Sequence, residues 1–216
     1  HLGLSQNVTA APFSERHIDG VVEALSACDS CHGQAGQSMP PPSVLGFTST
    51  QAVEVGAHAA HVLAPHALSP PLACSSCHLM PTQVMSPGHI DTDLPAEVFP
   101  AALQSLATAD SAQAQWNRQE ATCSNVYCHG GGEKLRRDRA SSILREPVWT
   151  ALEQSQASCG RCHGLPPVDG AHDASMHLNT CVGCHSQTVD AYGQILINTQ
   201  SDTITSAHIN GSIDVR

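Results

Sequence analysis

The apolar residues of this chain come in short runs that glycine and proline interrupt, which predicts short elements joined by loops. The clearest element lies at 51–63, where Gly56 is the one helix breaker and the preceding residues 48–51 fit a capping box. We expect this helix to stop before Pro65. Further helices are expected over 101–122 and 149–158, a small strand pair within 191–215, and irregular loops at 40–42, 70–71 and 130–132.

No run approaches the roughly 20 apolar residues that a transmembrane helix needs, so we expect no membrane span. Large apolar side chains are scarce, because aromatic residues make up only 3% of the 216 residues, while Gly (16) and Pro (14) are frequent. The net charge of -10 argues against a nucleic-acid partner, since phosphates would be repelled. We therefore expect a mostly coil fold with short α-helices and little β structure, whose interior is filled by something other than side chains.

The ten cysteines form five pairs, and a histidine directly follows each pair. Four pairs have two residues between the cysteines, and the third pair along the chain has four. The Cys-x-x-Cys-His pattern is the attachment signal for c-type haem, in which two thioether bonds hold the porphyrin and the histidine ligates its iron. The motifs, numbered as sites 1 to 5 in chain order, are Cys28/Cys31/His32, Cys74/Cys77/His78, Cys123/Cys128/His129, Cys159/Cys162/His163 and Cys181/Cys184/His185.

Two other interpretations of paired cysteines are weaker. Zinc sites also use Cys-x-x-Cys pairs, but they do not require a histidine after the second cysteine, and here one follows all five pairs. Disulfide bonds that connect distant parts of a chain are poorly served by thiols two residues apart. We therefore predict five covalently bound haem c groups, closely packed, which supply the apolar surface that the side chains lack.

Nine histidines remain for the sixth coordination position of the five irons, and four methionines are the alternative ligands. The excess of histidine favours two histidines on every iron. His58 and His61 are three residues apart on the expected helix, so both rings lie on one face and can serve two neighbouring irons.

An internal repeat ranks the distal candidates. In 28–91, and again in 159–211, two Cys-x-x-Cys-His motifs flank a Gly-Ala-His sequence, and a further histidine follows them. We therefore divide the chain into 1–100 with the first motif pair, 101–146 with site 3, and 147–216 with the second motif pair. In order of support, the distal candidates are His58, His61, His89, His177, His208 and His17, then His172, with His1 and His66 last.

The chain resembles the bacterial multihaem c-type cytochromes that mix Cys-x-x-Cys-His and Cys-x4-Cys-His motifs, which are abundant in metal-reducing bacteria. The resemblance spans nearly the whole chain and rests on 56–61, 123–132, 159–167 and 208–211. It implies a multihaem cytochrome c architecture organised around a closely packed haem chain, and electron transfer outside the cytoplasm. Some cytochromes of this kind polymerise, often with a histidine of one subunit ligating a haem of the next. We therefore expect a homopolymer, in which this chain is a subunit of an extracellular conducting filament.

Two alternative functions stay open at this point, a soluble monomeric periplasmic electron carrier and a haem reductase with one open iron. No motif has the lysine in place of histidine that some pentahaem reductases carry, so we expect an electron-transfer protein and not an enzyme. The chain begins at His1 and not at Met, so we expect a mature form, secreted to the periplasm or the cell exterior. Its expected partners are redox proteins or extracellular electron acceptors.

Overall fold

The structure is a computed structural model, and it describes residues 28–63, 68–91, 95–152, 156–199, 204–212 and 214. The candidates His1, His17 and His66 lie outside these ranges. Most of the described chain forms turns and coil, which confirms the predicted fold class. The described elements are therefore short, and they serve mainly to hold the five motifs in place.

The regular elements are two helices, two strand pairs and several single turns of 3-10 helix. The helices are α1 (His58–Val62) and α2 (Val182–His185). Strand β1 (Gln115–Asn117) pairs antiparallel with β2 (Thr122–Ser124), and β3 (Ile197–Asn198) pairs antiparallel with β4 (Thr205–Ser206), which confirms the strand pair expected within 191–215. The 3-10 turns are η1 (Cys28–Ser30), η2 (Cys74–Ser76), η3 (Leu106–Thr108), η4 (Tyr127–His129), η5 (Leu135–Arg137) and η6 (Leu178–Thr180).

The helices predicted from the sequence are longer than those that the structure contains. The helix expected over 51–63 is confined to α1, because Gly56 adopts φ +39° and breaks the preceding turns. The helix expected over 101–122 is wrong, since Asp110, Ser111 and Ala121 have left-handed φ values of 49°, 57° and 50°. The described part of 149–158 forms turns and not a helix. Polar segments without an apolar stripe have no face to pack, so propensity alone does not sustain a helix there.

The hydrophobic core of the described residues is small. Val55 is the one large side chain that is fully buried there, and the other buried apolar residues include four alanines. Trp149 packs against the N-terminal side of α1, where its Nε1 donates to the carbonyl of Val53 at 2.9 Å. A Cβ on Gly56 would lie 1.8 Å from that indole nitrogen, so glycine is what permits the close packing. The tryptophan thereby fixes the position of α1 and its two histidines.

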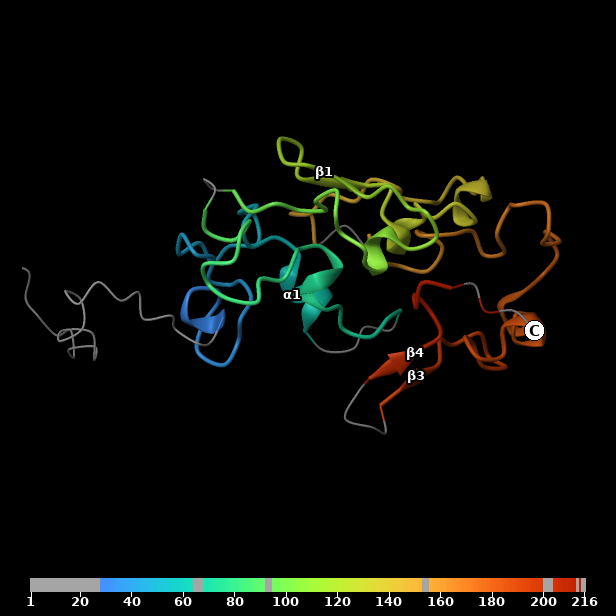
Figure 1. Cartoon of the computed structure of the whole chain (residues 1–216). Coiled ribbons are helices and arrows are strands. Elements are labelled where there is room, and N and C mark those ends of the chain that lie inside the picture. The colour runs from blue at the N-terminus through green and yellow to red at the C-terminus, as the bar shows by residue number, and fades with distance from the viewer. Residues whose placement is uncertain are drawn as a thin grey trace, which may run out of the picture.

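The described chain is elongated (Figure 1). The blue segment with site 1 lies at one end and the orange segment with site 5 at the other. The red C-terminal segment returns to the middle, below α1, where His208 Nδ1 donates to the carbonyl of Leu68. The hydroxyl of Tyr127 donates to the carbonyl of Ser212 at 3.3 Å and ties the same segment to site 3.

Candidate haem-binding sites

Most of the Cys-x-x-Cys-His motifs fold as a single helical turn. At sites 1, 2 and 5, the backbone N–H of the histidine donates to the carbonyl of the first cysteine, at 2.9, 3.0 and 2.8 Å. Residues three apart lie on the same side of such a turn, so both thiols project to one side and the histidine follows directly. With this spacing, two sulfurs can reach one porphyrin while the imidazole points toward the iron at its centre.

Site 3 has four residues between its cysteines and folds differently. Cys123 lies on β2 and Cys128 on η4, and the chain between them turns outward through Asn125, which has φ +53°. A Cβ on Gly131 would lie 2.2 Å from the carbonyl carbon of Asn125, so the glycine after the motif allows this loop to fold back. The longer spacing is therefore absorbed by a loop, and both cysteines remain part of one site.

The polypeptide buries the ten motif cysteines to different extents. Half of the cysteines are partly buried, and these are Cys77, Cys123, Cys128, Cys162 and Cys181. The other half are exposed, and these are Cys28, Cys31, Cys74, Cys159 and Cys184.

The exposure of Cys31 and Cys184 has a physical reason in the local chain. Each is the second cysteine of its motif and closes a single turn, in which its N–H donates to the carbonyl of the first cysteine, at 3.2 Å in site 1 and 3.1 Å in site 5. Sites 1 and 5 lie at the two ends of the molecule, where few other segments pack over such a turn (Figure 1). A thioether bond requires a sulfur that a vinyl group can reach, so exposure is compatible with the predicted attachment.

Each motif histidine faces a second histidine from another part of the chain. The ring centroids in the five pairs are 6.0 to 6.4 Å apart. The pairs are His32 with His89 at site 1, His78 with His58 at site 2, His129 with His61 at site 3, His163 with His208 at site 4, and His185 with His172 at site 5.

The ring spacing fits an iron atom between two imidazoles. A first-row metal binds each Nε2 at about 2 Å, which sets the ring centroids of a bis-histidine pair roughly 6 to 6.5 Å apart. All five observed spacings lie in this range. Aromatic rings that merely touch spread over about 4.5 to 7 Å, so five pairs with nearly the same spacing indicate a common cause. The residues present therefore fit bis-histidine haem at every site.

The second ring nitrogen of these histidines is held by oxygen acceptors. In eight of the ten rings, Nδ1 lies within hydrogen-bond distance of an oxygen, which in seven cases is a backbone carbonyl. Since Nδ1 must then carry the proton, Nε2 presents its lone pair, as a metal ligand requires. The carbonyl acceptors belong to Val55, Ala57, Val84, Glu97, Gly164, Asp214 and Leu68.

His172, and not His177, is the histidine that faces site 5. Its ring is half-buried, as are the other nine paired rings, whereas His177 is exposed and no ring of the described residues faces it. The two repeat units then pair in the same way. In each unit, the first motif faces the histidine that follows the second motif, and the second motif faces the histidine of the Gly-Ala-His sequence.

Burial shifts the pKa values of motif residues at sites 2 and 3. It lowers the pKa of His129 to about 4, with a further contribution from neighbouring His61, so this ring is neutral at physiological pH. Burial also raises the pKa of Cys77 to about 11 and the pKa of Cys128 to about 12. These sulfurs sit where a charged thiolate is unfavourable and a neutral thioether is acceptable.

The two alternative uses of the cysteines find no support in this geometry. All ten cysteines lie within the described residues, and each is a free thiol. Among the described residues, no group of three or more His, Cys, Asp or Glu side chains is arranged to hold a metal ion. The described residues therefore present no set of four ligands for a tetrahedral zinc ion.

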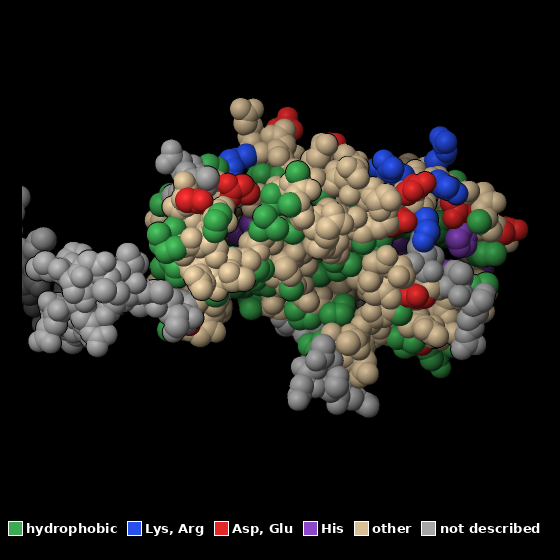
Figure 2. Space-filling view, in the orientation of Figure 1, with side chains coloured by type: hydrophobic (Ala, Val, Ile, Leu, Met, Phe, Trp, Pro, Cys, Tyr) green, Lys and Arg blue, Asp and Glu red, His purple; other side chains and the backbone are tan. Residues whose placement is uncertain are grey.

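The polypeptide by itself leaves many large apolar side chains uncovered. Leu45, Phe47, Leu79 and Met85 are each about half exposed or more, and Figure 2 shows apolar side chains spread over the visible face. This exposure agrees with the shortage of side-chain core that the composition predicts.

Sites 1, 2 and 3 are neighbours in space. Burial lowers the pKa of His32, and the nearby rings of His89 and His78 lower it further, which places site 2 beside site 1. Sites 2 and 3 share α1, because His58 and His61 lie on this helix and face different motifs.

The remaining sites continue the same order. A Cβ on Gly130 would lie 2.5 Å from the carbonyl oxygen of Cys162, so site 4 packs directly against site 3. Sites 4 and 5 are joined by the C-terminal segment, where His208 faces site 4 and the carbonyl of Asp214 accepts from His185 Nδ1 at 2.8 Å. Six residues span at most about 20 Å, so the two sites lie close together. The five sites form one line in chain order.

Asp138 supports site 4 and was not a candidate from sequence. Its carboxylate is 3% exposed and accepts hydrogen bonds from the N–H groups of Ala140, Gly164 and Val168. Gly164 in turn supplies the carbonyl that accepts from His163 Nδ1 at 2.8 Å. Burial by itself raises the pKa of Asp138, but the three N–H groups outweigh it and hold the pKa below its usual value. Nothing in the local sequence distinguishes this aspartate from a surface residue.

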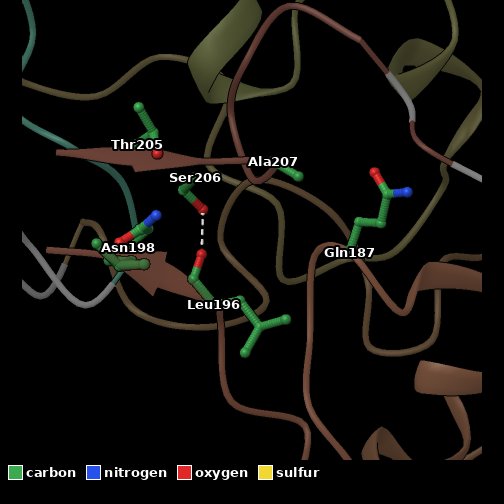
Figure 3. A pocket seen from close by; sticks show the side chains of 7 residues that line it. Gln187, Leu196, Asn198, Thr205, Ser206 and Ala207 are labelled. Atoms are coloured by element: carbon green, nitrogen blue, oxygen red, sulfur yellow. Dashed lines mark hydrogen bonds between the residues drawn. The ribbon is translucent and has the colours of Figure 1, made fainter. Parts of the chain in front are cut away.

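A pocket of the described surface is lined in part by sequence neighbours of His185 and His208. It opens between β3 and β4, where the Ser206 hydroxyl donates to the carbonyl of Leu196 at 2.6 Å (Figure 3). Its lining consists of Gln187, Leu196, Ile197, Asn198, Thr205, Ser206 and Ala207, and it includes no cysteine, histidine or charged side chain. The chemistry of the chain is therefore concentrated at the paired histidines.

Residues 122–163, about a fifth of the chain, match the family described as the Geobacter CxxxxCH...CXXCH motif. The matched segment contains sites 3 and 4, the two motifs that pack directly against one another. This match supports a multihaem c-type cytochrome, a class of electron-transfer proteins. No curated protein and no solved structure matches the chain. Within the described residues, none of the helices has the length and apolar character to cross a membrane.

Proposed function

We propose that the chain binds five haem c groups, each held by two thioether bonds and two histidines, and conducts electrons along them outside the cytoplasm. The observation that carries the proposal is that all five motif histidines face a second histidine at the spacing of a shared iron. A haem iron at such a site changes between Fe(III) and Fe(II), so it takes up and releases one electron.

The pairing of the histidines favours a conduit over a reductase. A reductase needs an open coordination position, where a substrate replaces one ligand. Here a distal ring faces every motif histidine, and an Nδ1 hydrogen bond holds each of the five distal rings in place. The linear order of the sites provides one continuous route, with site 1 and site 5 at its two ends (Figure 1).

Assembly into a filament stays a prediction from the family resemblance. The ring pairs complete all five sites with histidines of a single chain. A filament of this protein would therefore be held by contacts between subunit surfaces, and not by a histidine that a neighbour donates to an incomplete iron. Electron microscopy of the secreted protein distinguishes fibres from a soluble monomeric carrier.

The test of the proposed function uses the protein purified from the secreted or periplasmic fraction of its host. A pyridine haemochrome assay is expected to give five haems per chain, and the reduced protein is expected to bind no carbon monoxide at stoichiometric levels. Stoichiometric carbon monoxide binding would reveal an open iron and would shift the assignment to an enzyme. Recovery of the haem-stained protein in the cytoplasm alone would contradict the proposed location.

A further inference from the structure

The distal histidine of site 5 has a hydrogen-bond partner of a different kind. His172 Nδ1 lies 3.0 and 3.1 Å from the two carboxylate oxygens of Asp169. In the other seven rings with a described Nδ1 partner, the acceptor is a neutral backbone carbonyl. Site 5 therefore has a negative charge directly behind one of its ligands.

The local chain holds this carboxylate in position. Asp169 Oδ1 also accepts hydrogen bonds from the backbone N–H groups of Ala171 and His172, at 2.9 and 3.1 Å. The turn passes through Gly170, which has φ +83°. The side chains of Asp169 and His172 are 23% and 29% exposed, and the hydrogen bond between them lies at the surface of the molecule. The aspartate is thus fixed by three donors, of which one is the imidazole.

We propose that Asp169 is a positioning residue that lowers the reduction potential of the haem at site 5, and so biases electrons away from this end of the chain. The inference rests on the proposed function, because it takes His172 as an axial ligand. A carboxylate that accepts the Nδ1 proton makes the imidazole a stronger donor to iron. The ferric state carries one more positive charge than the ferrous state, so it gains more from the stronger donor and from the nearby negative charge.

The test compares spectroelectrochemical titrations of the wild-type protein, Asp169→Asn and Asp173→Asn. In Asp169→Asn, the amide oxygen can still accept the backbone N–H groups, but the charge behind His172 is lost. Asp173 is the matched control, because its replacement removes the same charge from the same loop, while its carboxylate accepts from the N–H of Ser175 and not from the imidazole. A further variant, Asp169→Glu, keeps the charge and is expected to retain most of the low potential.

In Asp169→Asn, we expect one of the five redox components to shift toward higher potential, by at least a tenfold change in its ratio of reduced to oxidised haem. This corresponds to about 59 mV for a one-electron couple. The electron paramagnetic resonance signal of one ferric haem should change in the same variant, whereas Asp173→Asn should leave both readouts unchanged. Titrations of Asp169→Asn and wild type that superimpose would overturn the inference, as would an equal shift in Asp173→Asn.

The same preparations separate this inference from the proposed function. A haem count below five, or a His172→Gly variant whose site 5 iron stays closed, would contradict the proposed function itself. Five haems and an iron opened by His172→Gly, together with an unchanged titration of Asp169→Asn, would leave the proposed function intact and overturn only the role of Asp169.

Discussion

Replacement of His172 by glycine tests the pairing of site 5 directly. The ring of His172 lies 6.4 Å from the ring of His185, and we infer that these two rings share one iron. Its removal takes away one of the two axial ligands at one of the five sites. Carbon monoxide binds reduced iron that has an open position, so the expected result is one bound carbon monoxide per chain, or one fifth of the haem.

His177→Gly is the matched control, because it removes a histidine from the same loop region that is exposed and faces no described ring. The assay is a carbon monoxide titration of the dithionite-reduced proteins, followed by their visible spectra. We expect one equivalent for His172→Gly and none for His177→Gly or the wild type. Binding by His177→Gly, with none by His172→Gly, would refute the pairing read from the ring geometry.

Three further predictions concern other parts of the molecule. The planes of the two paired imidazoles are 16° to 25° apart at sites 1, 2 and 5, but 62° and 70° apart at sites 3 and 4. The electron paramagnetic resonance spectrum of the ferric protein is therefore expected to contain two strongly anisotropic low-spin signals beside three ordinary ones. Five alike signals would contradict this. Asp138→Ala leaves three backbone N–H groups without their acceptor and should lower the free energy of unfolding, measured in urea, by about 3 kcal/mol. Because the pKa of Asp138 is lowered in the folded protein, its contribution is complete above the unfolded pKa and is lost as pH falls through the folded value, so the variant should show a weaker loss of stability in acid. Gly56→Ala places a Cβ 1.8 Å from the Trp149 indole, so it should destabilise α1 by about 2 kcal/mol and cause partial loss of low-spin haem at sites 2 and 3. Gly46→Ala is the control, because Gly46 also has a positive φ, +83°, but a Cβ there would meet no other atom. Equal effects of the two glycine variants would argue against the role of the indole contact.

The sequence predicts the coil-rich fold class better than the bounds of individual helices. Five Cys–His motifs and few aromatic residues are enough to indicate a coil-rich chain built around apolar cofactors. The prediction of a helix over 101–122 was wrong because this polar segment has no apolar stripe with which to pack, and propensity alone does not sustain a helix. There, short turns such as η3, capped by the Ser105 hydroxyl, are set by local hydrogen bonds.

The spacing of the motifs also does not predict how exposed each cysteine is. Cys31 and Cys184 are exposed while Cys128 is partly buried, although all three are the second cysteine of their motifs. Cys31 and Cys184 each close a single helical turn, whereas Cys128 follows the longer loop through Asn125, so the local path of the chain differs (Figure 1).

The pairing of distal histidines depends on the path of the chain, which spacing does not reveal. His208 reaches site 4 because the C-terminal segment returns to the middle of the molecule, where Leu68 accepts its Nδ1 proton. The sequence also contained a signal that favours His172 over His177, since His172 follows Gly-Ala as His58 does. The role of Asp169 has no such signal, because a carboxylate three residues before a histidine is common in surface turns.

Intact-mass spectrometry of the protein purified from its host measures the covalent attachment of haem. We expect the mass of the polypeptide plus five haem groups, retained after denaturation because thioether bonds hold them. The bare polypeptide mass, or a mass that reports metal ions without porphyrin, would contradict this expectation.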